Sequence, residues 1–451
     1  MKKSLYLVVV LLAVSMSLYS AGEQETESGD TTVVRVWAND AHNKPEYTST
    51  IQEFMDNEGK ELGIKIDHQV YGGDYYNSLD IAIAAGEEPH VFKSRKSGQY
   101  AEMGKIIPLK ELPGGQELID ETAGLHMEDV GMFNGEVYAI PIRVTTQNLI
   151  YNKELFNELN LKVPESWADM REAAKKITEA GKGRVYGFAL PLKYANYKYY
   201  FVGFPAAPSI GHQFFNHKTG RFDFMSLSPY FDFIQQMIDD GSMFPGIENL
   251  DFDTMRAQFA AGNIGMLIGN SFDVGVLYDQ FPAQMEWGVA PIPVMDPNNR
   301  YKQVGNPGAF YVISSKVKEE GIEDEVMEVY KKLVSIEHLA KTYENGKDIP
   351  IRGEEVTSHA AEPSREQFKA FADLTNVYIK PAYPESKIRV EGESYSDVFS
   401  KIITGRVDTE KALADLDERY NKAIDEAIDN GRLDISQYID PNYDEKVKYV
   451  R

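Results

Sequence analysis

The stretch TVVRVWANDAHNKPEYTSTIQEFMDNEGKELGIKIDHQVY, from Thr32 to Tyr71, decides the fold. It begins with an alternating apolar strand over 32–37, has helical spacing of apolar residues over 47–63, and alternates again over 64–71. A second helical stretch over 74–85 and a strand starting at Val91 follow. Strands that alternate with helices are typical of a parallel sheet with crossover helices. The sequence therefore predicts an α/β fold for its amino-terminal part.

Polar loops follow each of these predicted strands. In open α/β sheets, ligands bind beyond the carboxyl ends of the strands, so these loops are candidate binding loops. Trp37 is the main aromatic candidate, and core packing is its alternative. The loop residues that we expect to contact a ligand are Trp37, Asn39, Asp40, His42, Lys93 and Arg95.

Composition narrows the class of protein. A chain of 451 residues is too long for one ordinary core, so two domains are expected. The net charge of −23 argues against nucleic acid as a partner. Since the chain has no cysteine, disulfides, thiolate catalysis and cysteine-based metal sites are excluded. No motif predicts a metal or another cofactor.

The first residues are typical of an export signal. Lys2 and Lys3 precede an apolar run over 5–19, and small residues follow at 20–22. A membrane anchor is the alternative, but the run is shorter than the roughly 20 residues that span a bilayer. We expect a signal peptide over 1–22, a flexible leader over 23–32, and a periplasmic or extracellular protein without a lipidation cysteine.

The segment VYAIPIRVTTQNLIYNKELF, from Val137 to Phe156, carries polar side chains through a stretch that otherwise predicts a buried strand. Arg143 and Thr145 either meet a ligand or satisfy neighbouring backbone groups, and Asn148 is a weaker candidate. After Tyr151, helices and strands alternate again. Ser166 and Asp253 are the expected N-caps of helices over 168–180 and 254–261.

Several stretches together resemble one known family. They are YNSLDIAIAAGEEPHVF over 76–92, GEVYAIPIRVTTQNLIYNKELF over 135–156, VPESW over 163–167, FAAGNIGMLIG over 259–269, WGVAPIP over 287–293 and TGRVDTEKALADL over 404–416. In order and spacing the chain is similar to the maltose-binding-protein-like (family 1) extracellular solute-binding proteins of bacterial ABC importers. His90 departs from the pattern, which usually has Asp there.

The resemblance implies a two-lobed α/β protein of the periplasmic-binding-protein type II fold, in which each lobe is a mixed sheet flanked by helices. We expect residues 33–142 and 304–345 in the amino-terminal lobe, and 143–303 and 346–451 in the carboxyl-terminal lobe. The ligand would lie between the lobes and favour their closure. The implied partners of this monomer are a sugar or oligosaccharide and an importer permease.

The resemblance also implies that the segment over 137–156 passes between lobes beside the ligand. Sugar sites combine aromatic platforms with polar donors and acceptors. The further expected ligand residues are Arg143, Thr145, Tyr194, Asn196, Asn270, Phe272 and Asn306. Trp167 and Trp287 are expected to be structural.

Other functions stay open at this stage. No nucleophile elbow, zinc-protease motif, P-loop or dinucleotide fingerprint is present, so we expect no enzyme. The alternatives are an exported carbohydrate-active enzyme, because 70 acidic residues always allow a carboxylate pair, and a binding protein for a membrane sensor. The cations at 93, 95 and 96 raise the hypothesis of an acidic sugar, against the alternative of solvated charges.

Overall fold

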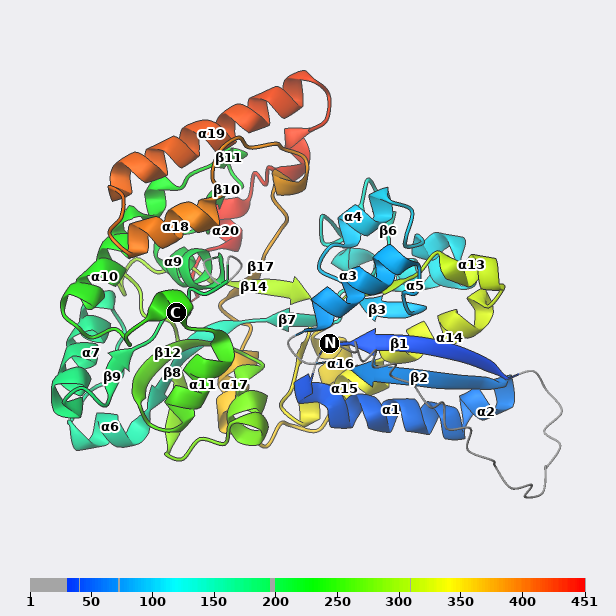
Figure 1. The fold of residues 1–451 in the computed structure, drawn as a ribbon, viewed down its shortest axis with the longest axis horizontal. Helices are drawn as coiled ribbons and strands as arrows, with labels where there is room; N and C mark the ends of the chain where they lie inside the picture. Colours follow the sequence, from blue (N-terminus) through cyan, green and yellow to red (C-terminus); the bar gives the residue numbers. More distant parts are fainter. Residues whose placement is uncertain (1–30, 40, 72–73, 195–198, 309, 451) are drawn as a thin grey trace, which may run out of the picture.

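The computed structural model describes residues 31–39, 41–71, 74–194, 199–308 and 310–450. The chain forms two lobes joined by extended segments that cross between them (Figure 1). The predicted signal peptide over 1–22 and most of the leader lie outside the described residues. Within the described residues, no helix is long and apolar enough to cross a membrane.

The first lobe is built on a sheet in the order β15-β3-β1-β2. β1, β2 and β3 are parallel, as the opening stretch predicts, and β15 is antiparallel to β3. Its strands are β1 (Thr32–Ala38), β2 (Ile64–Val70), β3 (Val91–Lys93) and β15 (Tyr311–Ile313). A small sheet follows with β4 (Met127–Glu128), β5 (Gly131–Phe133) and β6 (Glu136–Val137).

Successive side chains along these strands point to opposite faces of the sheet, and an apolar cluster lies on each face. Val34 and Val36 pack with α1 and α14, whereas Phe92 and Val312 pack with α3. The helices of this lobe are α1 (Lys44–Asp56), α2 (Glu58–Leu62), α3 (Tyr75–Ala85), α4 (Ser97–Glu102), α5 (Gly115–Glu121), α13 (Lys316–Glu320), α14 (Glu323–Leu333), α15 (Ile336–Glu344) and α16 (Glu354–Thr357), with short 3-10 turns η1 (Ala41–Asn43), η2 (Leu109–Glu111) and η3 (Ala123–Leu125).

The second lobe is built on a sheet in the order β13-β8-β12-β9, in which β8 is antiparallel to both neighbours. Its strands are β8 (Gln147–Asn152), β9 (Tyr186–Phe188), β12 (Ile264–Asn270) and β13 (Trp287–Ala290), and a hairpin adds β10 (Phe215–Asn216) and β11 (Arg221–Phe222). All seven residues of β12 are buried, as its continuous apolar run predicts.

Helices surround this second sheet and supply most of its core. They are α6 (Lys153–Glu158), α7 (Trp167–Gly181), α9 (Phe204–Ile210), α10 (Ser228–Asp239), α11 (Phe252–Ala260), α12 (Asp273–Gly275), α17 (Glu366–Ala372), α18 (Tyr395–Ile403), α19 (Thr409–Asp429) and α20 (Tyr443–Lys446). Shorter segments are the π-helical η4 (Tyr199–Gly203) and η7 (Val276–Gln280) and the 3-10 turns η5 (Met225–Leu227), η6 (Ile247–Asn249), η8 (Pro384–Ser386) and η9 (Ile435–Tyr438).

Helix caps test two of the sequence predictions. Ser166 caps α7 in a reciprocal capping box with Asp169, which confirms the first. The second is wrong: Asp251, and not Asp253, caps α11 by accepting from the Thr254 N–H. Asp253 faces Arg256 one turn on, at 2.9 Å. Two aspartates two positions apart offer similar cap signals, and the helix begins one residue before Asp253, which therefore lies inside its first turn.

A third sheet, which we call the hinge sheet, joins the lobes at their centre (Figure 1). Its order is β16-β7-β14-β17, with β7 (Arg143–Thr145), β14 (Gln303–Gly308), β16 (Ile349–Pro350) and β17 (Val377–Ile379). β7 continues through Thr146 directly into β8 of the second lobe. The predicted crossing segment therefore runs from the hinge sheet into the second lobe.

Candidate functional site

Pairing in the hinge sheet brings three predicted residues to one face. Thr145 lies opposite Asn306, and Arg143 lies opposite Gly308. Paired residues and alternate residues of a strand share a face of a sheet. Arg143, Thr145 and Asn306 therefore project from the same face, at the junction of the lobes.

Asp348, immediately before β16, holds Arg143 in place. Its two carboxylate oxygens accept hydrogen bonds from Arg143 Nη1 at 3.0 Å and from the Asn43 side-chain amide. His42 Nε2 lies 3.6 Å from the same carboxylate. Burial alone would raise the pKa of Asp348, but the charge of Arg143 and the contact with His42 outweigh it and hold the pKa well below its usual range. Asp348 is thus an ionised anchor between the first lobe and the hinge sheet.

The ammonium group of Lys93 is buried beside two tyrosines. It is 3% exposed, Nζ donates to the Tyr47 hydroxyl at 2.6 Å, and Nζ lies 4.7 Å from the centroid of the Tyr311 ring. Burial, with the charge of Arg143, lowers its pKa well below the usual range. In the next loop, Lys96 pairs with Asp80 at 2.6 Å.

His90 bears no relation to these cations in space. It begins β3 at the end opposite Lys93, where Nδ1 accepts the Arg35 N–H at 3.1 Å. Its Nε2 lies 3.1 Å from Glu320. The departure from the family pattern at His90 therefore lies at the other end of β3 from the cations of the binding loop.

Arg95, Asn39 and Trp37 gather around tyrosines. The Arg95 guanidinium lies 3.5 Å from the centroid of the Tyr76 ring, and Asn39 Nδ2 donates to the Tyr76 hydroxyl at 3.0 Å. Trp37 is partly buried, with its ring centroid 4.8 Å from that of Tyr71. These residues form an aromatic border on the first lobe, beyond the carboxyl ends of β1 and β3.

The second lobe brings Phe272 to the same junction. Its ring centroid lies 5.8 Å from the His42 ring and 5.8 Å from the Arg143 guanidinium. Asn270, at the end of β12, is 1% exposed and accepts from Gln147 Nε2 at 3.1 Å, which gives it a structural contact. Tyr194 is 48% exposed. Asp40 and Asn196 lie outside the described residues. Trp167 and Trp287 are buried, with 7% and 5% of their surface exposed, as expected.

Polar side chains of the crossing segment mostly satisfy backbone groups. Thr146 donates to the Phe371 carbonyl at 2.9 Å, Gln147 to the Tyr200 carbonyl at 3.1 Å, and Asn148 to the Ala370 carbonyl at 3.1 Å. The alternative interpretation therefore holds for Asn148. Arg143 and Thr145 differ, because they lie in the hinge sheet.

Tyr200 is a site residue that the sequence analysis missed. Its hydroxyl accepts from Asn306 Nδ2 at 3.5 Å, and its ring stacks on Phe204 at 5.4 Å. Burial raises its pKa, while the charges of Arg143 and Arg95 act in the opposite direction. The pKa of Tyr200 is therefore influenced by an arginine of the hinge sheet and by an arginine of the first lobe. It is one of two adjacent tyrosines in KYYFVG, and no signal in the sequence distinguished it.

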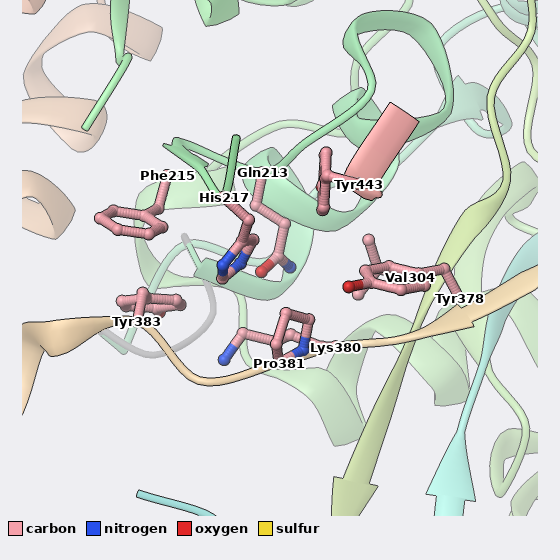
Figure 2. Close-up of a pocket in the computed structure, with 9 residues that line it drawn as sticks. All are labelled: Gln213, Phe215, His217, Val304, Tyr378, Lys380, Pro381, Tyr383 and Tyr443. Atoms are coloured by element: carbon pink, nitrogen blue, oxygen red, sulfur yellow. The ribbon is translucent and has the colours of Figure 1, made fainter. Parts of the chain in front are cut away.

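A small pocket adjoins this site along the hinge sheet (Figure 2). Val304 and Tyr378 are register partners on β14 and β17, so they share the face that carries Asn306. Lys380, just after β17, turns its ammonium toward Tyr383, 4.2 Å from the ring centroid (Figure 2). Burial lowers the pKa of Lys380 to about 8, against the charges of Glu385 and Asp129. The cavity, of about 10 Å³, has room for one water and not for a sugar.

The site offers binding chemistry: hydroxyl, amide and guanidinium groups on the hinge sheet, with aromatic rings from both lobes beside them. Within the described ranges, no group of three or more His, Asp or Glu side chains is arranged to hold a metal ion. Such a set recognises a polar, ring-shaped molecule by hydrogen bonds at its rim and apolar contact at its faces.

Comparison with known proteins gives consistent matches. The family model described as bacterial extracellular solute-binding protein matches residues 41–337. A maltotriose-binding protein of Pyrococcus abyssi is 25% identical over 285 residues, which are 60% of this chain and only 55% of that relative's length. Among solved structures, the maltose/maltodextrin-binding domain of Bdellovibrio bacteriovorus bound to maltotriose has a TM-score of 0.65 at 20% identity and covers 88% of this chain and 100% of its own. A Listeria monocytogenes ABC substrate-binding protein in complex with cycloalternan matches equally, with a TM-score of 0.65, 20% identity, and coverage of 88% and 100%.

Proposed function

The chain belongs to the bacterial extracellular solute-binding protein family, and on that premise we propose that it captures a sugar or oligosaccharide between its lobes and delivers it to an ABC importer. The names of its relatives support the ligand class, since one is a maltotriose-binding protein. We further propose that it acts as a monomer without catalysis. We also propose that the lobes divide near the boundaries predicted from the sequence, except that α16 (Glu354–Thr357), beyond the predicted boundary at 345, packs with the first lobe.

One observation carries the proposal: the polar face of the hinge sheet lies between aromatic residues of both lobes. Asn306 and Arg143 provide donors there, and Phe272 and Tyr200 border them from the second lobe. On the first-lobe side, Tyr76 is close enough to Tyr200 to affect its pKa. A sugar ring has hydroxyls at its rim and C–H groups on its faces, so this arrangement suits it.

Closure of the lobes follows from the same geometry. A ligand that rests on one lobe gains contacts with the other only when the lobes approach each other, so binding favours the closed form. The four strands of the hinge sheet absorb the change of angle between the lobes. The closed form is the one that a permease would recognise.

A thermal-shift screen across mono- and oligosaccharides tests the proposal. A ligand at 100 times its Kd should stabilise the protein by about 2.7 kcal/mol and raise its Tm. Chromatography of the same mixtures after long incubation should recover the sugars intact, whereas cleavage products would support the enzyme alternative. If no sugar raises the Tm and none is bound in calorimetry, the proposed ligand class is wrong.

Two variants locate the site once a ligand is found. Asn306→Ala should weaken binding roughly tenfold, the effect of one hydrogen bond, and Phe272→Ala by roughly ten- to a hundredfold, because an aromatic contact surface is lost. Tyr278→Ala is the matched control, since this second-lobe tyrosine is 39% exposed and bonds Gln367 instead of the site. Equal losses in all three variants would place the ligand elsewhere.

The charge of the ligand needs its own test. Of the loop cations, Lys93 is buried and Lys96 pairs with Asp80, whereas Arg95 is exposed on the Tyr76 ring. Calorimetry should therefore compare a uronic sugar with its neutral counterpart on the wild type and on Arg95→Ala. A preference for the uronic sugar that disappears in the variant would support an acidic ligand, and a preference for the neutral sugar would exclude it.

A further inference from the structure

A second set of contacts joins the lobes away from the hinge sheet. In the first lobe, Asp129 forms the turn between β4 and β5, with a φ of 61°. Its carboxylate accepts one hydrogen bond from the Ser386 hydroxyl at 2.6 Å and another from the Tyr438 hydroxyl at 3.0 Å. Ser386 and Tyr438 both belong to the second lobe, so one carboxylate connects two of its segments to the first lobe.

Lys387 adds a parallel connection. Its ammonium donates to the Asn134 side-chain carbonyl at 2.9 Å and lies 3.5 Å from Glu128. Glu128 also accepts the backbone N–H groups of Asn134 and Gly135, at 2.6 and 3.1 Å. These backbone hydrogen bonds hold the Glu128 carboxylate in place independently of Lys387, so little of its side-chain conformational entropy is lost when the contact with Lys387 forms.

The two sides of this contact belong to separate cores. Met132 and Val137 of the hairpin pack into the first-lobe core, whereas Tyr438 and Tyr383 pack into the second-lobe core. The contact therefore stabilises a relative position of the lobes and not the interior of either. A groove of about 820 Å³, walled by both lobes, includes Glu128, Asn134, Lys387 and Tyr438 in its lining.

The chain also links this contact to the hinge. Ser386 and Lys387 follow β17 by a short segment that begins with Lys380 (Figure 2). A change of angle at β17 must therefore move η8 relative to the first-lobe hairpin. When the lobes separate, the Asp129 hydrogen bonds cannot all persist, because their donors lie on the moving side.

We propose that Asp129, Glu128 and Asn134 form an inter-lobe latch with Ser386, Lys387 and Tyr438, which holds the lobes together without ligand and sets the fraction of closed molecules. The latch needs no bound sugar. A protein that is closed part of the time before it binds has a smaller conformational cost of binding, so the latch should strengthen the affinity for ligand. This effect on affinity rests on the proposed function.

The test removes donors on the second lobe and leaves the hairpin intact. Ser386→Ala combined with Tyr438→Phe deletes both hydroxyls that Asp129 accepts, and phenylalanine keeps the burial of the Tyr438 ring. The control is Tyr443→Phe, which deletes a buried hydroxyl that donates to Gly211 at 2.8 Å within the second lobe. Because the chain has no cysteine, spin labels at Glu117→Cys and Asp429→Cys report one distance between the lobes.

Without ligand, the double variant should shift the ratio of long to short label distances about tenfold toward the long distance, as expected for loss of charge-assisted hydrogen bonds. Tyr443→Phe should have the same distribution of label distances as the labelled protein without this substitution. Lys387→Met should shift it in the same direction as the double variant. An unchanged distribution in the double variant, or an equal shift in the control, would overturn the latch.

The ligand measurement separates the two proposals. If a sugar binds, its Kd should be up to tenfold weaker in the double variant, and saturating sugar should restore the short distance. If no sugar binds, the proposed function fails, but the label distances still decide whether the latch exists. Loss of folding is ruled out when circular dichroism and Tm of the variant match those of Tyr443→Phe.

Discussion

Replacing Asp348 with alanine should destabilise the protein through the charge that is left behind. The Asp348 side chain is 8% exposed and accepts from Arg143 at 3.0 Å and from Asn43. Its removal leaves the Arg143 guanidinium, 16% exposed, without this carboxylate. Removing one partner of a buried ion pair lowers the free energy of unfolding by roughly 3–5 kcal/mol. Replacing both partners by apolar residues costs less, because no unpaired charge is left.

Calorimetry measures this cost as a shift in Tm. For a chain of 451 residues the entropy of unfolding is roughly 0.9 kcal/mol per kelvin, so a loss of about 4 kcal/mol lowers the Tm by about 4 °C. The control is Asp425→Ala, which breaks an Arg–Asp pair with Arg221 that is 56% and 43% exposed, and should change the Tm by less than about 1 °C.

A double variant distinguishes the unpaired charge from a simple loss of packing. Asp348→Ala combined with Arg143→Met should cost clearly less than the sum of the two single changes, because it leaves no unpaired cation. Additive losses, or a Tm for Asp348→Ala equal to that of the Asp425→Ala control, would refute the reasoning.

Three further predictions concern stability and binding. Ser166→Ala should reduce the free energy of unfolding by about 1 kcal/mol, measured in urea, because the capping box with Asp169 is lost; no change would mean that water replaces the cap. Burial lowers the pKa of His217 from 6.5 to about 4 and that of His338 to about 3. The unfolded chain therefore binds protons from pH 6.5 downward while the native protein does not, so stability should fall by about 2 kcal/mol per histidine between pH 7.5 and 5. His217→Asn, whose amide can replace the Nδ1–H donor, should flatten this dependence in denaturation curves, and an unaltered slope would contradict it. Trp37→Ala should weaken sugar binding by roughly 1–3 kcal/mol in calorimetry while circular dichroism stays native; an unfolded variant would show that Trp37 belongs to the core.

Local patterns predicted the secondary structure well where one physical cause dominates. The alternating strands β1 and β2 follow from periodicity alone. The cap of α11 was misassigned because Asp251 and Asp253 give similar cap signals in the sequence, and the helix begins at Phe252. Errors of two residues in the position of a helix cap arise where several residues near the helix start could serve as the cap.

The site was harder to predict because distant contacts define it. Lys93 was correctly placed at a strand end, but Tyr47 and Tyr311 bury it, and neither is near it in sequence. Asp348 and Tyr200 became visible only when the hinge sheet brought their segments to Arg143 and Asn306. Strand ends indicate where a site lies, and tertiary packing decides which side chains remain available there.

The strand order of the first sheet also constrains when this protein can fold. β15, the partner of β3, is made more than two hundred positions later, after all four strands of the second lobe's sheet. Until residues 311–313 have left the ribosome, β3 has an unpaired edge and the first core lacks α14. The first lobe must therefore stay incompletely folded through most of the synthesis of the chain.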